Sequence, residues 1–305
     1  MKVLVTGGSG MVGRNILEHA GRKGHDVLAP PRAEVDLLDA AATASYLRRE
    51  KPDVVVHAAG RVGGIQANIA DPVRFLVENT DIGRNVILGA RAAGVRNLLN
   101  LASSCIYPRA APSPLKESYV LEGALEPTNE GYAIAKIHAL RLCSYLARTE
   151  GLAYRSLVPC NLYGRHDHFD PQRGHLVASL IHRLHQAARA GQTTVSMWGD
   201  GTARREFMFV GDLAGLVWAA VGRCASLPQE MNAGVGTDHS IREYYEAVAR
   251  IVGFKGSFEP DLTKPTGMPR KLVDTSCAKA WGWQATTRLE DGLRVAYKSY
   301  LESAA

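Results

Sequence analysis

The sequence predicts an α/β fold, in which a doubly wound parallel sheet is joined to a smaller C-terminal α/β lobe. Short apolar, β-branched runs alternate with helix-length segments through the first half of the chain, which favours a parallel sheet with helices on both faces. A glycine-rich turn directly follows the first of these runs. Beyond about residue 213 the alternation becomes looser, and 305 residues are enough for a main domain and a second lobe.

The first expected strand, residues 2–6, leads into a turn with Gly7, Gly10 and Gly13 and then into a helical pattern over residues 15–22. Glycines at this spacing let the backbone approach a pyrophosphate, and the helix then offers its free N–H groups. Turns also use glycine for positive φ values, so the triplet alone is weak. Because it stands directly after a strand, a dinucleotide site of the Rossmann type is the favoured interpretation.

The second expected strand, residues 25–29, ends shortly before Arg32. In a dinucleotide-binding fold this strand end faces the adenosine ribose, where an acidic residue selects NAD. No acid stands there, and Arg32 could meet a 2′-phosphate, so the segment favours NADP. Asp39 has two open interpretations, as a contact to the adenine edge or as the N-cap of a helix over residues 40–49.

The alternation continues with a buried strand that begins at Asp53 and ends in a loop containing Ala58 and Ala59. Small residues there would let a cofactor lie flat against the edge of the sheet. A long helix over residues 71–93 and a strand over residues 97–102 follow. In such a sheet, ligands bind at the carboxyl ends of the strands.

Ser103 stands at the end of one predicted strand, and Tyr132 and Lys136 stand four residues apart in the next helical pattern. At that spacing a phenol and an ammonium share one face of a helix. With a hydroxyl at the strand end they make a set suited to proton transfer. Any helix can carry such a pair by chance, so the rest of the chain decides its meaning. Cys105, two residues after Ser103, is a possible fourth group.

Composition excludes several classes of protein. The net charge of +6 is modest and its lysines and arginines are scattered, so nucleic-acid binding is not expected. No apolar run approaches the ~18 residues needed to span a bilayer, and the first residues show no signal-peptide pattern, so we expect a cytoplasmic protein. Five widely spaced cysteines without a C-x-x-C pair indicate neither a disulfide framework nor a zinc site.

With these residues placed, the chain resembles the extended short-chain dehydrogenases/reductases over nearly its whole length. Within that superfamily it closely resembles the GDP-L-fucose synthase family. The strings that carry the closer resemblance are Val62-Gly63-Gly64-Ile65, Ser103-Ser104-Cys105-Ile106-Tyr107-Pro108, Glu126-Pro127-Thr128-Asn129-Glu130, Asn161-Leu162-Tyr163-Gly164 and Arg205-Glu206-Phe207. The resemblance implies NADPH-dependent 3,5-epimerisation and 4-reduction of GDP-4-keto-6-deoxy-D-mannose.

The resemblance also implies a role for each catalytic candidate. Tyr132 would protonate the C4 oxygen, while Lys136 would bind the nicotinamide ribose and lower the pKa of the phenol. Ser103 would hydrogen-bond the substrate carbonyl. Cys105 and His175 would exchange protons at C3 and C5, whose hydrogens the C4 ketone acidifies.

The residues implied for binding fall into two sets, and no metal is expected. The cofactor set is Gly7, Gly10, Met11, Val12, Gly13, Arg32, Leu38, Asp39, Ala58, Ala59, Tyr132, Lys136, Pro159, Asn161, Leu162 and His175. The substrate set, which would hold the nucleotide diphosphate and base of a GDP-sugar, is Arg183, Trp198, Arg205, Arg270 and Lys271. Family members usually dimerise through the helix that contains Tyr132 and the long helix before it, so a homodimer is expected.

Domain boundaries and alternatives complete these expectations. Residues 1–165 would bind NADP, with residues 200–235 partly returning to that domain, and residues 166–305 would form mainly the nucleotide-sugar lobe. Gly131 departs from the family, which usually has proline there. The alternatives are a related GDP-4-keto-6-deoxyhexose reductase, a colitose-type synthase acting on a 3-deoxy sugar, and a non-catalytic NAD(P)-binding regulator.

Overall fold

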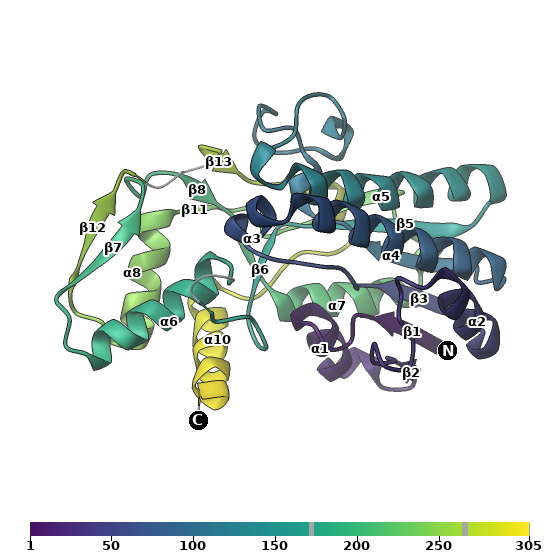
Figure 1. Ribbon diagram of the computed structural model, residues 1–305, viewed down its shortest axis with the longest axis horizontal. Coiled ribbons are helices and arrows are strands. Elements are labelled where there is room, and N and C mark those ends of the chain that lie inside the picture. The colour runs from purple at the N-terminus through teal and green to yellow at the C-terminus, as the bar shows by residue number, and fades with distance from the viewer. Residues whose placement is uncertain (171–173, 264–267, 305) are drawn as a thin grey trace.

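A six-stranded parallel sheet forms the centre of the computed structural model, which describes residues 1–170, 174–263 and 268–304 (Figure 1). In spatial order its strands are β10 (Glu230–Ala233), β5 (Ala153–Pro159), β4 (Asn97–Leu101), β3 (Val54–His57), β1 (Lys2–Thr6) and β2 (Asp26–Leu28). Each neighbouring pair runs parallel, from β2 at one edge to β10 at the other. The predicted doubly wound α/β fold is confirmed.

Helices cover both faces of this sheet, because successive residues of each strand point to opposite sides. On one face Val3 and Val5 belong to a core shared with α1 (Met11–Glu18) and α7 (Val210–Val221). On the other face, Leu4 belongs to a second core. That second core is shared with α2 (Ala40–Glu50), α4 (Pro72–Ala92) and α5 (Glu130–Glu150). Figure 1 shows these two helical layers above and below the strands.

The first helix differs from its prediction. It begins at Met11, before the predicted start at residue 15, and ends at Glu18, where His19 turns to extended backbone and the short 3₁₀ helix η1 (Ala20–Arg22) follows. Glycines weaken a helical pattern in sequence, yet Gly13 lies inside α1 because its missing side chain allows close packing. The last residue of the string Val62-Gly63-Gly64-Ile65 begins another helix, α3 (Ile65–Ala70).

The smaller lobe has its own apolar core. Three helices, α6 (Leu176–Arg189), α8 (Ile241–Val252) and α10 (Leu289–Ala304), pack around it. Beside them lies a parallel pair of strands, β7 (Thr194–Trp198) and β12 (Ser257–Asp261). The lobe lies at the end of the molecule away from the N-terminus (Figure 1).

Short strands link the lobe to the large sheet. β6 (Asn161–Tyr163) pairs with β9 (Phe207–Phe209), and β8 (Arg204–Arg205) lies between β11 (His239–Ser240) and β13 (Arg270–Lys271). The chain then returns from β9 into α7 and later into β10, which is followed near the sheet edge by α9 (Ser276–Trp281). Across the described ranges, the structure holds no helix long and apolar enough to cross a membrane.

Candidate active site

The turn after β1 is shaped by two glycines that tolerate no side chain. Gly7 has φ +72°, and a Cβ there would lie 2.7 Å from Cα of Ala59. A Cβ on Gly13 would lie 2.1 Å from the carbonyl oxygen of Gly7. Gly10 caps α1 without a side-chain hydrogen bond, and the first turn, which includes Met11 and Val12, holds no acidic group. The open backbone and the free helix N–H groups fit a dinucleotide pyrophosphate.

The loop after β3 meets this glycine turn through Thr6. The Ala59 N–H donates to Thr6 Oγ1 at 3.2 Å, and the same hydroxyl lies 2.9 Å from Nδ1 of His57. Burial, with a smaller effect of Lys136, lowers the pKa of His57 to about 3, so this imidazole is neutral. Ala58 and Ala59 are thereby held against Gly7, where the sequence predicts the cofactor.

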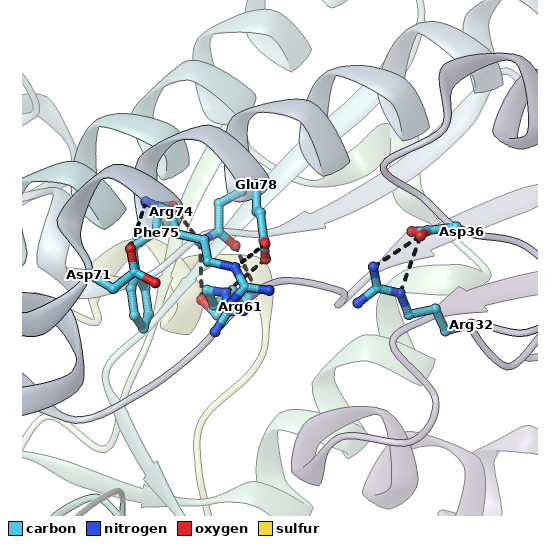
Figure 2. A network of polar contacts seen from close by, with 8 residues as sticks. Arg32, Asp36, Arg61, Asp71, Arg74, Phe75 and Glu78 are labelled. Carbon is cyan, nitrogen blue, oxygen red and sulfur yellow. Dashed lines mark hydrogen bonds and ion pairs between the residues drawn. The ribbon is translucent and has the colours of Figure 1, made fainter.

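Arg32 lies on the surface and forms an ion pair with Asp36. Its Nε and Nη2 atoms donate to Asp36 Oδ2 at 3.3 and 3.0 Å, as Figure 2 shows. The Leu38 N–H donates to the other carboxylate oxygen of Asp36 at 3.1 Å, and this bond together with Arg32 lowers the pKa of Asp36. Asp39 caps α2, because its Oδ1 accepts from the N–H groups of residues 41 and 42 at 2.8 and 2.9 Å. Of the two interpretations of Asp39, the structure therefore shows the helix N-cap.

Ser103 lies at the centre of the candidate catalytic groups. It caps the short 3₁₀ helix η2 (Ser104–Ile106), and its Oγ accepts from the Cys105 N–H at 3.4 Å. Its side chain also lies beside the Tyr132 phenol and the Cys105 thiol, and its influence lowers the pKa of each group, against the effect of burial. One hydroxyl therefore acts on two of the predicted proton-transfer groups.

Tyr132 and Lys136 lie on the first turns of α5, as their spacing predicts. Burial, with the nearby Cys105, raises the pKa of Tyr132 well above its ordinary value. The Lys136 Nζ atom donates to the Leu101 carbonyl at 2.9 Å and lies 5.7 Å from the centre of the Tyr132 ring. Burial lowers the pKa of Lys136 to about 8, which Cys105 partly opposes. A cation so close to the phenol favours its phenolate form.

Cys105 and His175 come from distant segments and share one charged neighbour. Cys105 is 6% exposed, and burial raises the pKa of its thiol, while the cations of Lys271 and Lys136 oppose that rise. His175 is the N-cap residue of α6, and burial, His168 and Lys271 lower the pKa of its imidazole. Lys271 thus acts electrostatically on both groups, so each of them lies within the range of its charge.

Three further cofactor candidates follow the sheet in β5 and β6. Pro159 is the last residue of β5, while Asn161 and Leu162 begin β6. Asn161 Nδ2 donates to the Glu206 carbonyl at 3.0 Å, which joins β6 to the segment before β9. This bond places the strand end beside the lobe, where a cofactor and a substrate in neighbouring sites would meet.

Lys271 and Arg270 are neighbours in sequence but face opposite sides of β13. Arg270 forms an ion pair with Asp238, which Arg204 also binds at 2.8 Å. Lys271 pairs in register with Arg205, and Cys105, Cys160 and Glu126 act on its charge. Burial lowers the pKa of both Lys271 and Arg205, and Glu126 opposes this for each of them. Only Lys271 of this predicted pair is therefore joined to the catalytic groups.

Arg183 and Trp198 lie deeper in the lobe. Arg183 donates to the Tyr245 hydroxyl at 3.1 Å and to the Ser196 carbonyl, so its guanidinium is held beside β7. Trp198 ends β7 and is 40% exposed, a fraction that leaves part of its ring able to stack on a ligand. Both residues lie on elements of the lobe and away from the glycine turn.

Two polar residues of the site were not singled out from the sequence. Glu126 faces Arg205 and Lys271, and its only sequence signal was its place in one of the strings that carry the resemblance. Glu206 is fully buried, and its carboxylate accepts from the N–H groups of Val235, Gly236 and Val273 at 2.6, 2.7 and 2.9 Å. That carboxylate ties β8 to β10 and β13, a role that only the tertiary structure reveals.

The arrangement suits general acid–base chemistry beside a nicotinamide-type site. A phenol and a thiol lie beside one hydroxyl, the buried Lys136 lies close to the phenol, and the partly buried Lys271 acts on both the thiol and the imidazole of His175. Such groups can stabilise charge on a carbonyl oxygen while protons move at neighbouring carbons. No cluster of three metal-binding side chains occurs in the part of the chain that the structure describes.

Comparison with known proteins gives a consistent result. The family model described as the NAD dependent epimerase/dehydratase family matches residues 3–234. The GDP-L-fucose synthase of Azorhizobium caulinodans is 48% identical over 98% of this chain and 96% of its own length. The GDP-L-colitose synthase of Yersinia pseudotuberculosis is 45% identical, with 96% of each chain covered. A GDP-mannoheptose C4 reductase from Campylobacter jejuni, solved with NADP bound, has a TM-score of 0.88 at 29% identity, with 98% of each chain covered.

Proposed function

This chain belongs to the NAD dependent epimerase/dehydratase family, and we propose that it converts GDP-4-keto-6-deoxy-D-mannose to GDP-L-fucose by NADPH-dependent 3,5-epimerisation and 4-reduction. It is thus an oxidoreductase with epimerase activity. Relatives named GDP-L-fucose synthase from Azorhizobium caulinodans and Escherichia coli, at 48% and 40% identity over nearly the whole chain, support this reaction.

The observation that carries the proposal is the position of Ser103 between two kinds of chemistry. Its hydroxyl lies beside the Tyr132 phenol, the proposed proton donor of the reduction, and the Cys105 thiol, a proposed proton carrier of the epimerisation. A single C4 carbonyl seated at Ser103 would lie within reach of both groups. One site can then perform two reactions in turn.

In the epimerisation, Cys105 and His175 exchange protons with C3 and C5 of the sugar. One of them removes a proton from the ring carbon, and the bonding electrons move to the C4 oxygen as an enolate. Ser103 donates a hydrogen bond to that oxygen and stabilises its charge. The other member of the pair then returns a proton to the opposite face of the ring, which inverts the carbon.

In the reduction, Tyr132 gives its phenolic proton to the C4 oxygen as the carbonyl becomes an alcohol. The bound nicotinamide supplies the hydride that C4 receives. Lys136 stabilises the phenolate that remains, because its ammonium lies close to the ring and is fixed to the Leu101 carbonyl. Burial of these groups strengthens each charge interaction by excluding water.

We propose NADP(H) as the cofactor, held by the glycine turn and the Ala58–Ala59 loop. Arg32 would bind the 2′-phosphate, since it is an exposed cation close to the end of β2. A related GDP-sugar reductase structure with NADP bound supports this choice. Leu38 and Asp39 would lie along the adenine, and Pro159, Asn161, Leu162 and His175 would lie toward the nicotinamide.

The lobe would bind the GDP portion of the substrate. Arg205 and Lys271 are partly buried cations, and Lys271 acts on the catalytic groups, which suits the diphosphate. Arg183 and the partly exposed ring of Trp198 would contact the nucleoside, with Arg270 at the outer edge. Residues 1–165 and 200–235 would then hold the cofactor, and most of residues 166–305 the nucleotide sugar.

Deuterium exchange tests the proposal in two stages. The protein is incubated in deuterated water with GDP-4-keto-6-deoxy-D-mannose and without NADPH, and NMR should detect deuterium at C3 and C5. Addition of NADPH should then give GDP-L-fucose as the product identified by NMR. An absence of deuterium at both carbons would exclude the epimerase part of the function.

A second candidate is a colitose-type reaction, in which the substrate lacks the 3-hydroxyl group. It is favoured by the relative named GDP-L-colitose synthase, which is 45% identical to this chain. Parallel assays with the two 4-keto sugars would separate the candidates by the ratio of their kcat/KM values. A non-catalytic regulator is less favoured, because Tyr132 and Lys136 are both present and close together.

We further propose a cytoplasmic homodimer that forms through α4 and α5. These helices lie side by side on one face of the sheet (Figure 1). They expose large apolar side chains, namely Val73, Val77, Leu88, Ile134 and Tyr145. An apolar surface on a helix pair is suited to association with a second copy. The cytoplasmic location is supported by five cysteines that are all free thiols.

A further inference from the structure

Phe75 is an aromatic residue of α4 that packs directly against Tyr132 and has no part in the proposed chemistry. Its side chain is 3% exposed, and its ring meets that of Tyr132 edge to face, with 6.4 Å between centroids and 81° between planes. We propose that Phe75 is a positioning residue that fixes the Tyr132 ring for proton transfer, and that Arg61 holds Phe75 in place. The inference rests on the proposed role of Tyr132 in reduction.

The Tyr132 ring needs support at its side as well as at its tip. Ser103 acts on the phenol end of Tyr132, but an interaction at that end alone leaves the ring free to tilt. The Lys136 ammonium lies 5.7 Å from the ring centre. The edge-to-face contact with Phe75 adds a third constraint, and such contacts have a preferred geometry. Together the three neighbours define both the place and the tilt of the phenol.

Arg61 supports Phe75. The guanidinium carbon of Arg61 lies 5.8 Å from the centre of the Phe75 ring, within the range of a cation–π contact. Arg61 is itself held, because its Nε donates to Glu78 Oε2 at 2.8 Å and its N–H donates to Asn79 Oδ1 at 2.8 Å. Figure 2 shows Arg61, Phe75 and Glu78 as one group at the start of α4.

The backbone around Phe75 leaves little room for its ring to move. A Cβ on Gly63 would lie 3.1 Å from Cζ of Phe75, so the loop after β3 passes close to the ring tip. A Cβ on Gly131 would lie 2.8 Å from the Pro72 carbonyl oxygen, so the first turns of α4 and α5 are in close contact. Gly131 directly precedes Tyr132. The packing therefore couples the loop that carries Arg61 to the helix that carries the phenol.

The two half-reactions of the proposed function provide the test, because proton transfer from Tyr132 occurs only in the reduction. Phe75→Leu keeps an apolar side chain but removes the ring edge. We expect its NADPH-dependent kcat to fall about tenfold, since small misplacements of a reacting group are costly, while deuterium exchange at C3 and C5 falls less than about threefold. The KM for the sugar should remain close to that of the wild type.

Arg61→Ala and Arg74→Ala form a matched pair. Both arginines form an ion pair with Glu78, but only Arg61 lies over the Phe75 ring. We expect Arg61→Ala to lower reduction about threefold more than exchange, in line with a cation–π contact of modest strength, and Arg74→Ala to change neither rate. Equal effects of the two substitutions would overturn the role of Arg61.

Equal losses of reduction and exchange in Phe75→Leu, or no loss of reduction, would overturn the positioning role of Phe75. Crystal structures of the wild type and of Phe75→Leu give a measurement that needs no turnover. We expect the Tyr132 ring to move relative to Ser103 in the variant, and an unmoved ring would contradict the inference. Failure of the wild type to exchange or reduce the sugar would instead contradict the proposed function, so the two failures remain distinguishable.

Discussion

The Lys136 ammonium donates a hydrogen bond of 2.9 Å to the Leu101 carbonyl, and this bond fastens α5 to the end of β4. Two residues beyond Leu101, Ser103 contacts Tyr132 from the same strand end. The distance between Ser103 and Tyr132 is therefore set by the packing of one helix against one strand. The lysine that joins them is buried, and burial lowers its pKa to about 8.

The first prediction concerns the pH dependence of reduction. Lys136 stabilises the phenolate only while it is protonated, so kcat/KM should fall as pH rises through about 8, the pKa of the free enzyme's lysine. Steady-state rates between pH 6 and about 10 measure this fall, which is the alkaline limb of the pH profile. In Lys136→Arg, any remaining activity should lose the alkaline limb, because arginine stays charged. An unchanged limb in that variant would assign it to another group.

The second prediction separates the two half-reactions by substitution. Tyr132→Phe should lower reduction by about 10²-fold or more, because the proton donor is lost, while exchange at C3 and C5 persists. Cys105→Ser should have the reverse effect. It should lower the rate of exchange at C3 and C5, while a 4-keto sugar that is already epimerised should still be reduced. NMR of the recovered sugar measures both rates in one sample. Parallel loss of both reactions in each variant would contradict the division of roles.

Much of the central sheet was predictable because its signals are local. The strand at residues 2–6 was predicted with both ends correct, since a β-branched run ends abruptly at glycine. The long helix before Ser103 was predicted to within one residue at each end, because its length and periodicity are distinctive. Tyr132 and Lys136 were grouped correctly, since a spacing of four residues converges on any helix.

Other parts of the site depend on contacts between distant segments. Strands β8, β11 and β13 have only two residues each, so no periodicity marks them, yet the pairing of β8 with β13 sets Lys271 beside Arg205. Because neighbouring residues of a strand point to opposite sides, that same pairing turns Arg270 away from Lys271 and toward Asp238. The contact of Phe75 with Tyr132 joins two helices whose relative packing no local pattern encodes.

The third prediction concerns cofactor preference. Asp36 pairs with Arg32 and places a carboxylate near the expected 2′-phosphate. Asp36→Asn should therefore improve the KM for NADPH relative to NADH by about twofold to fivefold, which is the scale of an exposed ion pair. Arg32→Ala should shift the preference the other way. Steady-state kinetics with both cofactors test this, and equal preference in all three proteins would remove Arg32 from the site.

The fourth prediction concerns the glycine turn. Gly13→Ala would place a Cβ 2.1 Å from the Gly7 carbonyl oxygen, so the backbone must shift. We expect about 1–3 kcal/mol lower stability in urea unfolding and weaker NADPH binding by fluorescence titration. Gly222→Ala is the control, because a Cβ there meets no atom within 4 Å, and it should change stability by less than about 0.5 kcal/mol. Equal stability and binding in the two variants would contradict the close approach.

The last prediction tests assembly through the α4–α5 surface. Tyr145 on α5 is 52% exposed among the apolar side chains of that surface, and Leu301 on α10, a helix of the smaller lobe, is 42% exposed. A charge buried at an apolar interface is costly, so Tyr145→Glu should convert a dimer to a monomer in light scattering, while Leu301→Glu should not. Both side chains are already in contact with water in one copy, so neither substitution should disturb folding. Dissociation by Leu301→Glu alone would move the interface to the lobe, and a monomeric wild type would exclude the dimer.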